Sequence, residues 1–299
     1  MSARLPWIGA LLLLGTGWGS TQALGKIAVS SGHGPLMLIF WQTCIVVVVL
    51  GALLALRHRR RIPVSGAGLR ICTLIALTGT IIPNLSFYQA VAHLPAGIMS
   101  ILIATIPLIS FPIALLFGGD RFTLARLAGL LCGLAGVALI ALPKASLPDP
   151  GMIVWLPIAM IGPLFYAIEA NVVARWGTAG LDPVEALFGA SVIALVLLLP
   201  AVLIQGASVI PPAGFGKAGV ALLVMSVLHA VLYAGYVGLA ARAGAVFATQ
   251  TAYVVTGSGV FWAVALLGEE FAGTVWLAMA IMFAGLFLVT PRLRAARMA

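Results

Sequence analysis

Long apolar runs alternate with short polar segments along the whole chain. Ten runs come near or exceed the roughly 20 residues that an α-helix needs to cross the hydrocarbon core of a bilayer. They cover 6–28, 35–56, 69–93, 96–117, 123–142, 151–176, 183–204, 217–242, 245–267 and 274–290. Backbone polar groups in lipid must be satisfied within their own segment. The pattern therefore predicts an all-α polytopic membrane protein with ten transmembrane helices.

The two halves of the chain resemble each other. Residues 88–97 align with 236–245, and each half holds five apolar runs. Because five is odd, the second copy must enter the membrane in the opposite orientation. We therefore expect two inverted five-helix repeats, over 1–145 and 146–299. Inverted repeats are the usual basis of alternating access, with the substrate bound near the midplane between the halves.

The basic residues predict the orientation. Of sixteen Lys and Arg residues, all but Lys26, Lys144 and Lys217 lie at the termini or near the even-numbered loops. Basic residues are retained on the cytoplasmic face, so both termini are predicted to be cytoplasmic. The first run follows Arg4 as in a signal peptide, but it is long enough to span, so we expect it to be retained.

Composition supports a multi-pass protein of the cell inner (plasma) membrane. The 299 residues are 63% hydrophobic and 8% charged, against roughly 25% charged residues in soluble domains. The net charge of +9 does not indicate nucleic acid, because the basic residues lie beside apolar spans, where orientation and anionic lipid explain them. The three cysteines form no metal or disulfide pattern. We expect no catalytic residue, cofactor or metal; the expected partners are the bilayer and a small-molecule substrate.

Polar and aromatic residues recur at helical spacing inside several runs. Thr80, Asn84 and Tyr88 follow one another every fourth residue, and Pro83 should weaken the helix beside them, so that freed carbonyls can line a cavity. Further candidates in other runs are Trp18, Gln22, Tyr166, Glu169, His229, Tyr233, Tyr236, Gln250 and Tyr253. We predict that these residues line a substrate cavity; the alternative is packing and hydrogen bonding between neighbouring helices.

Three ionisable residues inside the runs have separate interpretations. Glu169 could bind a substrate amine or a coupling proton, or it could bond a neighbouring helix or cytoplasmic water. His229, near mid-depth, is a candidate for contact with substrate or a proton, although a neutral His can also satisfy a single bond to a partner. Lys26 lies near the outer end of the first run, and we expect it to extend to the interface.

Several marks together resemble a known family. They are Trp18-Gly19 followed by Lys26, Pro107, and short acidic turns at 119–121 and 268–270 that each precede a Gly- and Ala-rich helix. With these marks the chain resembles the EamA-like branch of the drug/metabolite transporter superfamily, and within it the YddG-type exporters of aromatic and other neutral amino acids. Asp120 stands where that family often shows Glu.

The resemblance implies a fold in which helices 1–4 and 6–9 surround a central cavity, with helices 5 and 10 at the periphery. In the predicted fifth helix, Gly129, Gly133 and Gly136 would permit close helix packing. Packing within the chain is the simpler interpretation and a dimer contact the alternative, so we expect a monomer or weak dimer.

The function expected from these features is secondary transport. The cavity would be aromatic and neutral-polar, which suits export of small neutral or zwitterionic metabolites such as amino acids, and suits sugar phosphates poorly because those need several basic residues. The scarcity of intramembrane acids favours facilitated diffusion over obligate proton antiport. Alternatives are export of other amphipathic metabolites or drugs, and an intramembrane lipid-modifying enzyme. The enzyme would need a clustered nucleophile, acid or base, and none is evident.

Overall fold

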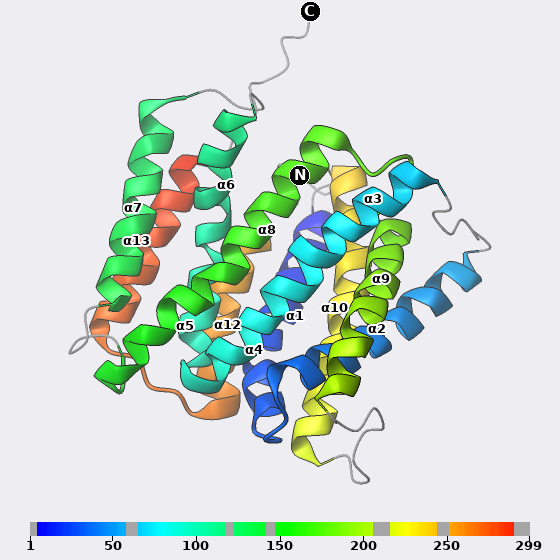
Figure 1. Cartoon of the computed structure of the whole chain (residues 1–299). Helices are drawn as coiled ribbons and strands as arrows, with labels where there is room; N and C mark the ends of the chain where they lie inside the picture. The colour runs from blue at the N-terminus through cyan, green and yellow to red at the C-terminus, as the bar shows by residue number, and fades with distance from the viewer. Residues whose placement is uncertain are drawn as a thin grey trace, which may run out of the picture.

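The computed structural model describes residues 5–57, 65–117, 122–141, 147–205, 216–243 and 251–289. Every regular element within these ranges is helical (Figure 1). In chain order they are α1 (Leu5–Val29), α2 (Pro35–Leu56), α3 (Gly66–Ile75), the π-helix η2 (Ala76–Ile81), α4 (Ile82–His93), α5 (Ala96–Ile103), α6 (Thr105–Leu116), α7 (Leu124–Ala141), the 3₁₀-helix η3 (Pro150–Trp155), α8 (Leu156–Trp176), α9 (Pro183–Ile204), α10 (Lys217–Ala243), α12 (Thr251–Leu267) and α13 (Gly273–Val289). The predicted all-α class is confirmed for these residues.

The helices coincide with the predicted apolar runs, and local signals set their starts. Both α2 and α9 begin and end at the predicted residues, each with a proline in its first turn, where no donor is lost. Asp182 and Glu185 form a capping box at the start of α9. Within the described ranges, six helical stretches are long and apolar enough to cross a membrane, and three shorter apolar helices accompany them. The 25 residues of α1 span roughly 37 Å at 1.5 Å per residue.

The third predicted run is interrupted at the expected place. The π-helix η2 separates α3 from α4, and Pro83 follows in the first turn of α4. A proline ring collides with the carbonyl four residues earlier, here that of Gly79, and it also lacks the N–H that would bond there. The wider π turn relieves both problems, and such turns are frequent at functional sites.

The fourth run is divided as well. Ala104 separates α5 from α6, and its N–H bonds to the carbonyl of Ile101 rather than continuing a regular helix. Pro107, three residues on, cannot donate to the carbonyl of Ile103. The two interruptions lie in helices that face the centre of the molecule.

The helix contacts follow a two-fold pattern that relates the two halves. Helix α1 of the first half packs against α10 and α12 of the second half. Helix α8 of the second half packs in the same way against α4 and α6 of the first half. Likewise α2 packs on α10 as α3 packs on α9, while the pairs α2–α9 and α7–α13 each join equivalent helices. This arrangement is the two-repeat architecture that the sequence alignment of the halves suggested.

Glycines bring α7 and α13 together at the edge of the molecule (Figure 1). A Cβ atom at Gly285 would lie 2.6 Å from the carbonyl oxygen of Gly129, and one at Gly136 would lie 2.5 Å from Met282 Cγ. Only residues without side chains permit this approach. The glycines of the fifth predicted helix therefore serve packing within the chain.

Candidate substrate cavity

A cavity of about 580 Å³ lies between the two repeats, within the ~300–1,000 Å³ range of small-molecule sites. Helices α1, α4, α5 and α6 of the first half and α8, α10 and α12 of the second supply most of its wall. Both halves therefore build the same cavity, and it lies where the interrupted helices meet.

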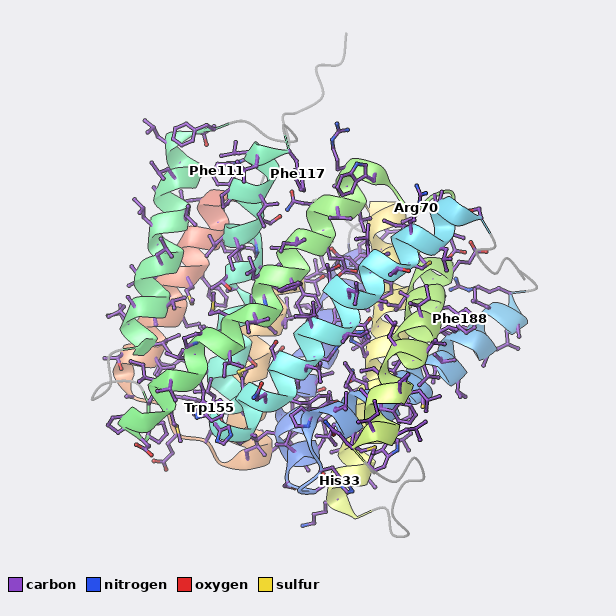
Figure 2. The ribbon with its side chains drawn as sticks, in the orientation of Figure 1. His33, Arg70, Phe111, Phe117, Trp155 and Phe188 are labelled. Carbon is purple, nitrogen blue, oxygen red and sulfur yellow. The ribbon has the colours of Figure 1, made fainter. Side chains whose placement is uncertain are left out.

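The cavity extends toward one end of the molecule and is closed at the other. We call these the Arg70 end and the Trp155 end, after residues that mark them (Figure 2). The lining reaches Ala114 and Leu286, near the last turns of α6 and α13, at the Arg70 end. Toward the Trp155 end, a fully buried apolar cluster fills the space between α4, α5 and α8. Its members include Val91, Leu94, Ile98, Ile101, Leu102 and Leu156.

Two charged side chains hold the turn between α4 and α5 at the closed end. The Lys26 ammonium donates to the carbonyl oxygens of Leu94 at 2.9 Å and Ala92 at 3.2 Å, at the end of α4. The Glu269 carboxylate accepts from the N–H groups of Ala96 at 2.7 Å and Gly97 at 3.0 Å, at the start of α5. Each charge complements the partial charge of the helix end that it meets. Backbone carbonyls thus bind the Lys26 ammonium at this end, and its extension to the membrane interface stays a prediction.

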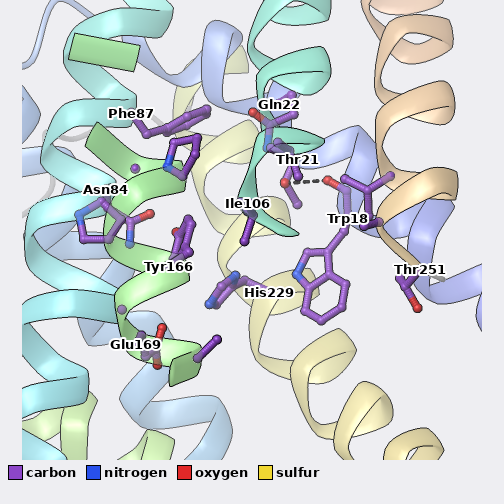
Figure 3. Close-up of a pocket in the computed structure, with 18 of the residues that line it drawn as sticks. Trp18, Thr21, Gln22, Asn84, Phe87, Ile106, Tyr166, Glu169, His229 and Thr251 are labelled. Carbon is purple, nitrogen blue, oxygen red and sulfur yellow. Dashed lines mark hydrogen bonds between the residues drawn. The ribbon is translucent and has the colours of Figure 1, made fainter. Parts of the chain in front are cut away.

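Eight of the predicted site residues line the cavity. They are Trp18, Gln22, Asn84, Tyr166, Glu169, His229, Tyr233 and Tyr236. Figure 3 shows Tyr166 and Glu169 on one wall, with His229 and Trp18 across the cavity from them. The Trp18 and Tyr236 rings meet edge to face, with centroids 5.6 Å apart, an arrangement favoured by their quadrupoles. The role of these residues as substrate ligands stays a prediction.

Glu169 occupies a space that the π-helix provides. A Cβ atom at Gly79 would lie 2.5 Å from both carboxylate oxygens of Glu169, so the carboxylate lies where any other residue would place a side chain. Gly79 is also the residue whose carbonyl Pro83 would obstruct in a regular helix. Proline and glycine together thus position the carboxylate against α3–α4.

Four predicted residues lie elsewhere. Tyr88 is completely buried outside the cavity, and its hydroxyl donates to Gln42 Oε1 at 2.6 Å. Thr80 is part of η2, where its carbonyl accepts from Asn84 Nδ2 at 2.7 Å. Tyr253 packs on Phe283 of α13, with ring centroids 5.8 Å apart. Gln250 lies outside the described residues.

The expected stripe on the third run fails for a geometric reason. Each step of four residues turns about 40° beyond a full turn of a 3.6-residue helix, so the three residues spread over about 80° of the helix surface. Of the three residues in that stripe, Asn84 alone lines the cavity.

Several lining residues carried no clear signal in the sequence. Phe87, Met99, Ile106 and Phe111 look like ordinary apolar positions, because nothing in a single span tells its lipid face from its inner face. Gln42 is different. It is a polar amide inside the apolar run of α2, and the cost of burying an amide in lipid could have identified it.

The wall of the cavity is mostly apolar and carries one carboxylate. Neither Lys nor Arg is among its described lining residues. In the part of the chain that the structure describes, no group of three or more His, Cys, Asp or Glu side chains could hold a metal ion. The site can therefore offer aromatic surface, a few amide and hydroxyl groups, one imidazole and one carboxyl group.

Several proteins resemble this chain in sequence or in structure. The chain is 29% identical over 226 residues to the probable terminal-alkyne amino-acid exporter of Streptantibioticus cattleyicolor, covering 73% of each chain. It is 28% identical over 294 residues to the uncharacterized inner membrane transporter YedA of Escherichia coli K12, covering 96% of this chain and 91% of YedA. A crystal structure of a protein with 20% identity superposes with a TM-score of 0.60 over 97% of this chain and 98% of that one, which shows the same fold.

Both halves match one family separately. Residues 5–142 and residues 153–290 each match the EamA-like transporter family, and together they cover nearly the whole chain. The predicted membership of the drug/metabolite transporter superfamily is confirmed, and the chain is a multi-pass membrane protein. It belongs to the EamA-like transporter family.

Proposed function

We propose that the protein is a secondary transporter of the inner (plasma) membrane that exports small neutral or zwitterionic metabolites, with amino acids, aromatic ones included, as the main class. The observation that carries this proposal is the cavity between the two repeats, which is large enough for a small metabolite and is lined by aromatic and neutral polar side chains. The relative named as an amino-acid exporter supports the cargo class.

The proposed mechanism is alternating access. In our proposal ten helices span the membrane as two inverted repeats, with both termini cytoplasmic, as the distribution of basic residues indicates. The Arg70 end is then cytoplasmic, and the described conformation is the one that receives cargo from the cytoplasm. Rocking of the repeats would close this end and part the apolar cluster at the Trp155 end. One chain forms the whole cavity, which supports a monomer or weak dimer as the working unit.

Transport can be measured directly in proteoliposomes that hold the purified full-length chain. We expect uptake of radiolabelled phenylalanine and tryptophan to saturate with concentration and to be inhibited by unlabelled neutral amino acids. Protein-free liposomes loaded in the same way provide the background. Absence of saturable flux for any neutral metabolite would contradict the transporter proposal and reopen the enzyme alternative.

Flux measurements in the same proteoliposomes can identify the energy source for transport. With one carboxylate and one imidazole in the described wall, we propose facilitated diffusion driven by the substrate gradient rather than obligate proton antiport. Phenylalanine flux should then be insensitive to an imposed pH gradient in the wild type and in the His229→Ala variant. A flux that follows the pH gradient, and that loses this response in Glu169→Gln, would show proton coupling instead.

A further inference from the structure

The geometry points to Glu169 as the binding site for a positively charged amine on the transported molecule, an inference that rests on the proposed transport function. It deepens that function by naming the chemical group that the cavity selects. Glu169 is the single carboxylic acid among the described lining residues, and neither Lys nor Arg accompanies it. A cargo with a cationic amine therefore meets a carboxylate that is not already paired with Lys or Arg.

The carboxylate has a built position. It fits against Gly79 in a space too small for any side chain at that residue. Both the π-helix η2 and Pro83 maintain this local geometry. A charged group whose position is fixed before the ligand arrives loses less entropy on binding, so its interaction contributes more to affinity.

The carboxylate also has unused hydrogen-bonding capacity. An ionised carboxylate only accepts hydrogen bonds, and a primary ammonium only donates them. No described group donates a hydrogen bond to Glu169. On the same wall, Asn84 uses its Nδ2 to bond the Thr80 carbonyl at 2.7 Å, and its Oδ1 points into the cavity (Figure 3). This wall thus presents acceptors.

The remainder of the cavity suits an apolar or aromatic group. Trp18, Tyr233, Tyr236 and Phe87 provide aromatic surface, and Tyr166 lies one turn from Glu169 on the same face of α8. Neither Lys nor Arg is among the described lining residues, so His229 is the one basic side chain there that could meet a substrate carboxylate. We therefore infer that the amine is the recognised charge and that the carboxylate of an amino acid contributes little, so that aromatic primary amines are ligands as well.

Competition between three analogues tests this inference. Radiolabelled phenethylamine is bound to the full-length chain in lipid nanodiscs and displaced by phenylalanine, by unlabelled phenethylamine or by 3-phenylpropionate, which lacks the amine. We expect the first two to displace it at similar concentrations and 3-phenylpropionate to be weaker by about tenfold or more. Equal displacement by phenethylamine and 3-phenylpropionate would overturn the inference.

Variants test whether Glu169 is responsible for the preference for an amine. Glu169→Gln keeps the shape and removes the charge, and we expect it to weaken phenethylamine binding about tenfold or more and to abolish the preference over 3-phenylpropionate. Glu270→Gln makes the same change at an exposed position outside the cavity and should leave both unchanged. Gly79→Ala should displace the carboxylate and weaken binding too, whereas Gly257→Ala, whose Cβ would lie 3.9 Å from the nearest side-chain atom, should not.

The outcomes separate this inference from the transport proposal. Phenethylamine binding that requires Glu169, without flux of any amino acid, would support the amine site and contradict amino-acid export. Saturable phenylalanine flux that is unchanged in Glu169→Gln would support export and overturn the amine site.

Discussion

The Tyr88 hydroxyl is completely buried and donates to Oε1 of the cavity-lining Gln42, which joins α4 to α2. Tyr88→Phe removes this donor and leaves a buried acceptor unpaired, at a cost of about 1–3 kcal/mol in the free energy of unfolding. We expect thermal unfolding in detergent, followed by intrinsic fluorescence, to shift down by several degrees, while the KM for phenylalanine flux changes less than the stability because Tyr88 itself does not line the cavity.

The matched change at Tyr236 should have the opposite effect on thermal stability and KM. Tyr236 lines the cavity, so Tyr236→Phe should change KM more than thermal stability. A Tyr88→Phe variant with normal stability and altered KM would show that Tyr88 contacts the cargo.

Single residues also show which parts of the candidate site can be predicted from the sequence alone. Glu169 and His229 could be identified as candidates because ionisable groups deep in apolar runs are costly. The pairing of Glu169 with Gly79 could not be predicted, since it depends on how α8 crosses the π turn of another helix. The same limit applies to Lys26 and Glu269, whose backbone partners lie in other elements.

Among the helices, the π turn before α4 has the clearest consequence for function. Pro83→Ala restores a backbone donor and removes the clash with Gly79, so a regular helix becomes accessible. Regularising the helix would rotate Asn84 relative to α8 and remove the space for the Glu169 carboxylate. We expect phenylalanine flux to fall severalfold with protein yield and thermal stability maintained. Pro112→Ala, within α6 and outside the lining, is the control, and an equal loss in both variants would contradict this role of η2.

The start of α5 depends on a side chain from the other repeat. Glu269 accepts two hydrogen bonds at this helix end, and loss of its charge in Glu269→Gln should cost about 0.3–2 kcal/mol in the free energy of unfolding. The fluorescence-detected unfolding temperature should fall accordingly. The exposed neighbour Glu270 provides the control as Glu270→Gln. Identical unfolding of both variants would mean that this contact does not stabilise the closed end.

Helix boundaries were predictable because hydrophobic length and proline positions determine them, as at α2 and α9. The face that each helix turns inward was not. Lipid is as apolar as the interior of the helix bundle, so the spacing of apolar residues in a span says little about which face points inward. The failure of the four-residue stripe at Tyr88 is one result, and the unrecognised lining residue Phe87 is another.

For the whole molecule, the central cavity lies between the two repeats and is closed at one end by a buried apolar cluster. Equivalent helices α1 and α8 each pack on partners from the opposite half, so the proposed change of access would have to rearrange contacts between the two repeats. Lys26 and Glu269 stabilise the closed end in the described conformation.

The most direct test of the proposed function is whether cargo passes through this cavity. Ala114 lines its Arg70 end, and Leu116, two residues on, is 85% exposed. Ala114→Trp and Leu116→Trp can be compared for saturable phenylalanine uptake in proteoliposomes at equal protein content. We predict that Ala114→Trp abolishes the flux by filling the path, and that Leu116→Trp transports like the wild type. Equal flux in the two variants would contradict transport through the cavity.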